Sequence, residues 1–293
     1  MTDKQTPPLP APATFLSGES GSVVGKRLTV TRTAADWAFD LANLAALTGP
    51  RLDRLTAAQP PRRVLVLSIY RPGSLLPRAV PRLRSDRHDV SFACGAIGEI
   101  EPALVAETAL GDLAGGGKFE NLNRLLEAAP PLDGFDWLVV CDDDVELAPR
   151  FLDRALALCE RLGLDLAQPA QTMRSHAAWR VTRRRPLSLA RRTNYVEIGP
   201  VTIFARRVAT ELTPFPELRF GWGLDNHWAA LARERGWRLG ILDALPVRHE
   251  AQKVATTYTH AEAIEEGQRF LAGRPYLRRE EAQHTLATHR RLP

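Results

Sequence analysis

A run of acidic residues directly after an apolar segment is the feature that most restricts how this chain can fold. Residues 137–140 read Trp-Leu-Val-Val, and residues 142–146 read Asp-Asp-Asp-Val-Glu. Short continuous apolar runs are typical of strands buried on both faces of an α/β sheet. Side chains alternate along an extended backbone, so Asp142 and Asp144 would share one side. The run predicts a site for Mg²⁺ or Mn²⁺, with a plain acidic turn after a core strand as the alternative.

Strand and helix patterns alternate along the middle of the chain. Apolar strand patterns are found at 64–69, 90–94, 137–141, 166–167, 201–204 and 239–242. Helix patterns are found at 119–129, 151–162 and 226–235. This alternation predicts an open α/β fold, a single Rossmann-like domain with a mixed, mostly parallel sheet over residues 61–250.

Extensions are expected on both sides of that domain. Residues 1–22 are rich in Pro, Ser, Gly and Thr and are predicted to form a disordered tail. Residues 23–60 are predicted to form a short edge strand at Leu28–Val30 and then an amphipathic helix. Residues 251–293 are predicted to begin as a lid and continue as a mostly helical extension. The apolar positions of the predicted N-terminal helix include Trp37, Leu41, Leu44 and Leu47.

Composition narrows the class of protein. The 293 residues are 44% hydrophobic and 25% charged, which is ordinary for a soluble globular protein. No apolar stretch approaches the roughly 20 residues that span a membrane, and the first residues do not resemble a signal peptide. We therefore expect a cytoplasmic protein with at most peripheral membrane contact. The three cysteines form no C-x-x-C pair and are expected to be buried free thiols.

The net charge of +5 is modest, but the positive charge is concentrated in one basic segment. Residues 171–192 contain seven arginines and no acidic residue. A solvated loop is one interpretation, and a surface for an anionic or lipid-linked acceptor, a nucleotide diphosphate or an anionic membrane is the other. Nucleic acid is not expected as a partner, because the chain has no recognised binding motif and the segment is not interleaved with stacking aromatics.

Three further motifs flank the acidic run. Residues 115–123 read Gly-Gly-Gly-Lys-Phe-Glu-Asn-Leu-Asn, residues 221–225 read Gly-Trp-Gly-Leu-Asp, and residues 247–249 read Val-Arg-His. In this order the motifs resemble the GT-A glycosyltransferases, especially their large family 2, over about residues 62–250. The resemblance implies a GT-A domain that moves a sugar from a nucleotide diphosphate-sugar donor to an acceptor hydroxyl, with Mn²⁺ or Mg²⁺ as cofactor.

The resemblance also implies a role for individual residues. Metal ligands would be Asp142, Asp144 and His249, and Asp225 would be the general base of an inverting reaction. The donor would be bound by Ser68, Tyr70, Arg71, Lys118, Asn123, Asp142 and Asp143. The chain departs from the family after the second strand, where an acidic pair is usual and residues 95–101 read Gly-Ala-Ile-Gly-Glu-Ile-Glu, so the donor base is not predicted.

Other interpretations of the same residues stay open. Asp225 would also serve as a plain N-cap for a helix that begins at Asn226. A strand followed by Asp-x-Asp also begins haloacid-dehalogenase-type phosphatases, in which Asp142 would be the nucleophile and Asp144 the acid/base. A non-catalytic nucleotide-sugar binder is the third possibility. Glu197, before an apolar strand, is expected to face the acceptor.

Overall fold

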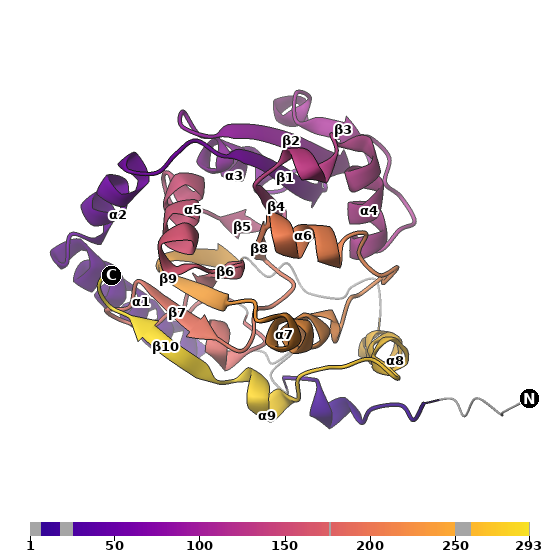
Figure 1. Ribbon diagram of the computed structural model, residues 1–293. Coiled ribbons are helices and arrows are strands. Elements are labelled where there is room, and N and C mark those ends of the chain that lie inside the picture. The colour runs from indigo at the N-terminus through magenta and orange to yellow at the C-terminus, as the bar shows by residue number, and fades with distance from the viewer. Residues whose placement is uncertain (1–6, 18–25, 176, 250–258, 293) are drawn as a thin grey trace, which may run out of the picture.

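A central β-sheet with helices on both faces forms the body of the protein (Figure 1). The computed structural model describes residues 7–17, 26–175, 177–249 and 259–292. The strands are β1 (Arg63–Tyr70), β2 (Asp89–Ala96), β3 (Thr108–Leu110), β4 (Trp137–Cys141), β5 (Val145–Glu146), β6 (Leu166–Gln171), β7 (Ala190–Thr193), β8 (Val201–Ala205), β9 (Leu239–His249) and β10 (Thr285–His289). The α-helices are α1 (Lys26–Ala45), α2 (Thr48–Ala57), α3 (Leu76–Leu83), α4 (Lys118–Ala128), α5 (Phe151–Leu162), α6 (Arg206–Leu212), α7 (Leu224–Arg235), α8 (His260–Leu271) and α9 (Arg279–Ala282).

The sheet has the order β10-β7-β9-β6-β8-β4-β1-β2-β3, and β5 pairs with β9 off this path. Strands β1, β2, β3, β4, β6, β9 and β10 run in one direction, whereas β5, β7 and β8 run in the other. The predicted α/β fold with a mixed, mostly parallel sheet is therefore confirmed. Because β1 and β4 are parallel neighbours, the segments that follow them meet at one edge of the sheet, where ligands of such sheets bind.

Two hydrophobic cores, one on each face, hold the sheet in place. Leu65 and Leu67 of β1 belong to the core that includes α4 and α7, whereas Val64 and Val66 belong to the core that includes α2, α3 and α5. Burial on both faces explains why β1 reads as a continuous apolar run. The three cysteines are buried and free, as predicted.

The N-terminal region differs from its prediction. The edge strand predicted at Leu28–Val30 is wrong, because α1 begins at Lys26 and includes these residues in its first turns. Two apolar residues in alternation are too short a signal, and Val30 lies seven positions before Trp37, which fits a helix equally well. Residues 7–17 of the predicted disordered tail pack on the body and bury the side chain of Phe15.

The C-terminal region also differs in part. It contains α8 and α9 as expected, but it then forms β10, which pairs antiparallel with β7 and extends the sheet at its edge. The predicted lid over 250–259 lies outside the described residues except for Thr259, which caps α8 through its side chain. None of the described helices is long and apolar enough to cross a membrane.

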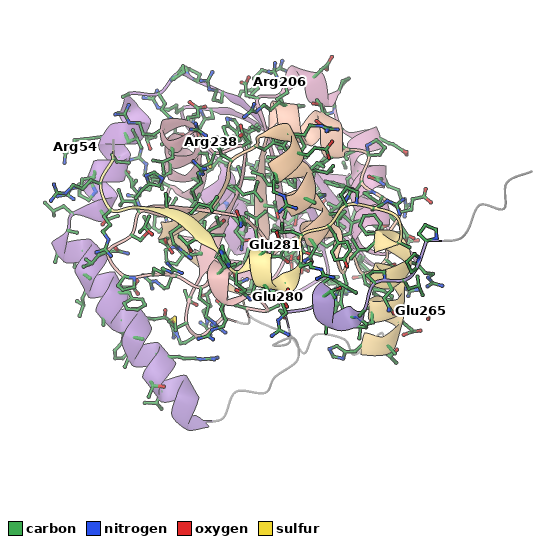
Figure 2. All side chains as sticks on the ribbon, turned by 60° about the horizontal axis from the view of Figure 1, so that its bottom comes forward. Arg54, Arg206, Arg238, Glu265, Glu280 and Glu281 are labelled. Atoms are coloured by element: carbon green, nitrogen blue, oxygen red, sulfur yellow. The ribbon has the colours of Figure 1, made fainter. Side chains whose placement is uncertain are left out.

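Arginines of the basic segment 171–192 are used inside the protein. Arg191 is fully buried, and its guanidinium donates to both carboxylate oxygens of Asp243 at 2.8 and 3.0 Å. It also donates to the carbonyls of Val181 and Arg183 at 2.7 Å each. Exposed charged side chains such as Arg54, Arg206 and Glu265 instead lie around the outside of the body (Figure 2).

We expect Asp243→Ala to lower the free energy of unfolding by about 3–5 kcal/mol, because it leaves the Arg191 charge buried without its partner. Denaturant unfolding followed by circular dichroism measures the loss. Glu265→Ala is the matched control, since its ion pair with Arg269 is exposed and should contribute less than about 1 kcal/mol. Equal losses in the two variants would contradict a structural role for the buried pair.

Candidate active site

The acidic run leaves the sheet at the carboxyl end of β4, all of whose residues are buried. The amide of Asp142 donates to the carbonyl of Pro200 at 2.8 Å, which ties the start of the run to the segment before β8. Asp143 turns toward β1, where a carboxylate oxygen accepts from the amide of Arg71 at 2.9 Å. Burial raises the pKa of Asp143, and the charges of Asp144 and Asp142 raise it further.

His249 meets the acidic run through a short pairing of β5 with the end of β9. Val145, next to Asp144, lies opposite His249 in this antiparallel pair. The Nε2 atom of His249 is 3.1 Å from Oδ2 of Asp144. Burial alone would lower the pKa of His249, but the hydrogen bond to Asp144 and the charges of Asp144 and Asp142 outweigh it and raise this pKa.

Asp142, Asp144 and His249 together form a candidate metal centre. One ligand atom from each lies within 4.8 Å of the others. Two carboxylates and an imidazole suit Mn²⁺ and related metals, whereas Mg²⁺ prefers oxygen ligands and water. The three residues therefore fit a divalent cation, and binding would require His249 to be neutral.

Lys118 joins the acidic run from the first turn of α4. Its Nζ donates to Oδ1 of Asp142 at 2.6 Å and to the carbonyl of Ile198 at 3.1 Å. Gly117 caps the helix just before it, and a side chain there would collide with the backbone of Arg219, whose Cα would lie 2.2 Å from the new Cβ. The glycines before Lys118 thus let this turn come close to its neighbours.

Two cavities meet at the acidic run. The glycine cavity, named for residues 115–117 in its wall, has a volume of 420 Å³. The tryptophan cavity, named for Trp179 and Trp222 in its wall, has a volume of 260 Å³. The residues common to both walls are Lys118, Asp142, Phe220 and His249. A molecule in either cavity would therefore touch the same charged boundary.

Asp225 lines the tryptophan cavity from the first turn of α7. The prediction that it caps a helix starting at Asn226 is wrong, because the helix begins at Leu224 and its cap is Gly223, with φ of 87°. The carboxylate accepts from the amide of Asn226 at 3.0 Å. Although a helix N-terminus favours a negative charge, burial dominates and raises the pKa of Asp225 to about 6.

Glu197 is a second buried carboxylate in the wall of this cavity. Its oxygens accept from the amide of Trp179 at 2.8 Å, from the hydroxyl of Thr182 at 3.1 Å and from the side chain of Gln171. Burial raises the pKa of Glu197 to about 8, so the side chain is mostly protonated at neutral pH. The predicted acceptor side of the site is thus built around two carboxyl groups.

Several predicted donor residues are not brought to either cavity. Ser68 is buried within β1, and the hydroxyl of Tyr70 lies 2.7 Å from that of Thr108, so neither side chain is placed to contact a base. The side chain of Asn123 exchanges two hydrogen bonds of 2.8 Å with the backbone of Phe215. Arg71, Lys118, Asp142, Asp143 and Asp144 do line the glycine cavity, together with His249.

Other residues of the site were not predicted. Asn121, rather than Asn123, lines the glycine cavity, because positions two apart on a helix point to nearly opposite sides. Arg219 also lines this cavity and lies two residues before the motif at 221–225. Phe15 reaches the tryptophan cavity from a segment whose composition gave no signal for it. These residues reach the site through packing against elements far away in the sequence, so local sequence patterns do not reveal them.

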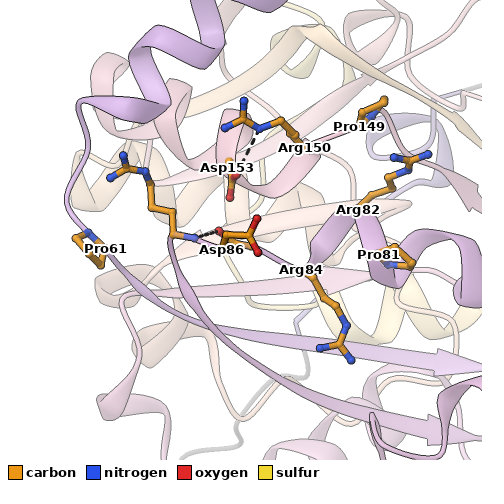
Figure 3. Close-up of a pocket in the computed structure, with 10 residues that line it drawn as sticks. Pro61, Pro81, Arg82, Arg84, Asp86, Pro149, Arg150 and Asp153 are labelled. Atoms are coloured by element: carbon orange, nitrogen blue, oxygen red, sulfur yellow. Dashed lines mark hydrogen bonds and ion pairs between the residues drawn. The ribbon is translucent and has the colours of Figure 1, made fainter.

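A further hollow of 670 Å³ lies away from this site, near the amino ends of β1 and β2 (Figure 3). Its wall carries Arg82, Arg84, Arg87 and Arg150 but also the carboxylates of Asp86 and Asp153, and the Arg87 guanidinium donates to the carbonyls of Gln59 and Ala57. Arg150 pairs with Asp53 at 3.0 Å, and Arg84 pairs with Glu107. This mixture of charges gives no defined preference for an anion or a cation, so the candidate active site is the pair of cavities at the acidic run.

No protein-family model matches the chain. No curated protein matches it. Among solved structures, S. aureus TarS 1–349 in complex with UDP-GlcNAc is similar with a TM-score of 0.48 and 12% identity, covering 70% of this chain and 64% of that one. A second structure of S. aureus TarS has a TM-score of 0.41 and 10% identity, covering 61% of this chain and 35% of that one. The chain thus spans less than two thirds of either structure, and similarity at this level carries no argument about activity.

We expect Gly199→Ala to weaken Mn²⁺ binding about tenfold, a change of ~1.4 kcal/mol, without unfolding the protein. The new Cβ would lie 2.7 Å from Oδ2 of Asp142 and 3.1 Å from Nζ of Lys118, so it would displace a proposed ligand. Isothermal titration calorimetry with Mn²⁺ measures the effect. Gly111→Ala is the matched control, since its Cβ would meet only Ile100 at an ordinary 3.6 Å. Unchanged affinity in Gly199→Ala would remove Asp142 from the metal centre.

Proposed function

We propose that this protein is a metal-dependent glycosyltransferase with a GT-A domain over residues 61–250. The observation that carries the proposal is the convergence of Asp142, Asp144 and His249 at the boundary between two cavities. A transferase needs this arrangement, because the bond that breaks belongs to one substrate and the bond that forms belongs to the other. The order of the sequence motifs, which resembles family 2, supports the same activity.

The glycine cavity is the proposed donor site. Arg71, Lys118 and Arg219 line it and supply positive charge for a diphosphate. Asp142, Asp144 and His249 would hold Mn²⁺ or Mg²⁺ beside it, where the cation would neutralise charge on the departing nucleoside diphosphate. The backbone of residues 115–117 allows close approach of the donor because it carries no side chains.

The tryptophan cavity is the proposed acceptor site, with Asp225 as general base. A hydroxyl is a weak nucleophile, and a carboxylate within hydrogen-bond reach takes its proton as it attacks. Lys118 and Asp142 lie at the boundary between this cavity and the donor site. The proposed inverting reaction requires the acceptor hydroxyl to approach the sugar carbon from the side opposite the departing diphosphate. Attack from that side would invert the configuration at the sugar carbon.

We propose that the acceptor is an uncharged polyol, such as a sugar ring, rather than an anionic or lipid-linked molecule. Asp225 is charged above about pH 6 and would repel an anion, and the protonated Glu197 beside it offers no positive charge to attract one. Trp222 and other aromatic side chains of the cavity offer apolar surface for the face of a ring. Arginines of the basic segment line neither cavity in the described part of the chain.

A thermal-shift panel tests the donor site. We expect one of the UDP-, GDP- or dTDP-sugars to raise the melting temperature by several degrees only when Mn²⁺ is present, because metal and diphosphate bind together. Asp144→Ala should abolish this joint effect and leave the unliganded protein folded. Stabilisation by no nucleotide under any metal condition would contradict the proposal and make a phosphatase assay with Asp142→Asn the next step.

Asp225→Asn separates a transferase from a binder. We expect it to lower kcat by about 10²–10⁴-fold while the donor affinity stays the same, because only proton removal from the acceptor is lost. A non-catalytic binder would show no turnover in either the wild type or the Asp225→Asn variant, and this result would contradict the proposal.

The pH dependence of the wild-type enzyme tests the same residue. The raised pKa keeps Asp225 protonated, and inactive as a base, up to about pH 6. With Mn²⁺ saturating, so that protonation of His249 does not displace the metal, we therefore expect kcat/KM to fall about tenfold per pH unit below that value and to level off above it. If kcat/KM instead began to fall only near pH 4, the ordinary pKa of a carboxyl group (~4), a different residue would be the general base.

A further inference from the structure

Helix α1 carries an apolar stripe that the rest of the described chain leaves uncovered. Val30, Trp37, Leu41 and Leu44 are 70%, 65%, 66% and 72% exposed. Together with the exposed Ala34 they are spaced alternately by four and three residues, the spacing of a seam between two helices. The helix runs along the edge of the body, as Figures 1 and 2 show from two directions. Sequence periodicity alone would place these residues in a core, whereas the structure turns them outward.

The opposite face of α1 is what fixes this orientation. Asp36 is buried and accepts from the amides of Met173 and Arg174 at 2.9 and 3.1 Å, and it also pairs with the guanidinium of Arg184 at 3.4 Å. The Arg184 guanidinium lies 5.4 Å from the ring centre of Phe39 on the same face. The helix cannot roll its stripe inward without leaving a buried charge unpaired, so the exposure of the stripe is imposed by the fold.

The charge of the outer face favours a protein partner over a lipid surface. Within residues 30–47, the positions on and beside the stripe contain a single ionisable residue, Asp40, and Nη2 of Arg184 donates to it at 2.8 Å. Attachment to an anionic membrane relies on Lys and Arg next to the apolar face, and within residues 30–47 this face offers none. Over these residues the charge of Asp40 is paired with Arg184, so the face does not repel a copy of itself.

The sizes of the residues on this face complement one another under a two-fold axis. If two copies of α1 pack antiparallel with the axis between Trp37 and Ala38, Trp37 lies opposite Ala38 of the second copy. The same alignment sets Leu41 opposite Ala34. It sets Val30 opposite Ala45 and Leu44 opposite Thr31, so each large side chain faces a small one. Closed two-fold pairing of this kind is the commonest form of homo-oligomer.

We propose that the protein forms a two-fold symmetric dimer in which the outer faces of two α1 helices pack antiparallel. The helix has 20 residues and only one of its faces enters the seam, whereas a stable complex usually takes roughly 20–30 residues from each partner. The dimer is therefore concentration-dependent. This proposal is independent of the enzymatic function, because α1 contributes no side chain to the wall of either cavity.

Sedimentation velocity on the full-length protein over ~1 to ~200 µM tests the proposal by mass action. We expect the weight-average mass to rise from that of the 32.4 kDa chain toward twice that value. Leu41→Glu should raise the dissociation constant at least about tenfold, because it sets a charge in the seam of both copies. Val105→Glu is the matched control, since Val105 is 64% exposed on a different surface, and it should leave dimerisation unchanged.

Cysteine cross-linking tests the antiparallel orientation. Two Ala38→Cys chains should form a disulfide across the axis, whereas the two Val30→Cys thiols would lie about 22 Å apart along the helices and should not. The native cysteines are buried, so oxidised wild type is the background control. A 32.4 kDa species at all concentrations, an unchanged dimer in Leu41→Glu, or efficient Val30→Cys cross-linking would overturn the proposal. Binding of a monomer to anionic vesicles would also overturn it, in favour of a lipid surface.

Discussion

The pairing of β5 with the last residues of β9 is the constraint on which the candidate site depends. Two backbone pairs, Val145 with His249 and Glu146 with Arg248, bring the far end of a long strand against the acidic run. Without them Asp142 and Asp144 would be a carboxylate pair at the end of a strand, and the boundary between the two cavities would lack its imidazole. A strand of two residues thus determines whether distant parts of the chain form one site.

Buried charge is distributed unequally between the scaffold and the site. In the scaffold, Arg191 and Asp243 pair with each other, and carbonyls of Val181 and Arg183 accept the remaining guanidinium hydrogen bonds, as a buried pair requires if it is to be tolerated. At the site, Asp225 and Glu197 are buried with raised pKa values, and no ion pair links either one to another described residue. Burying carboxyl groups in this way lowers the stability of the folded protein, but it lets these groups exchange protons near neutral pH. Such shifted pKa values are common at functional sites.

Local sequence patterns predicted the main strands of the sheet. The strands and site residues that were not predicted are defined by contacts between residues far apart in the sequence. The strands β1, β4 and β8 follow from apolar runs that any window of the sequence contains. The short strands β5, β7 and β10 have no such signal, because pairing with other strands defines them. At the site, the motif residues Lys118, Asp142 and His249 meet as expected. The family resemblance assigned Tyr70 and Asn123 to the donor, but their side chains make hydrogen bonds to Thr108 and Phe215 instead.

The wall of the tryptophan cavity joins two parts of the chain that are synthesised far apart in time. Phe15 and Leu16 form part of it, and His260 of α8 forms another part. A side chain added at Gly267 of α8 would meet a ring carbon of Phe15 at 3.0 Å, so these segments are packed against each other. On the ribosome, the early segment must wait for α8 before it finds its place. A nascent chain that has completed the strands through β9 therefore still lacks this part of the wall, and the cavity wall is complete only once α8 has emerged.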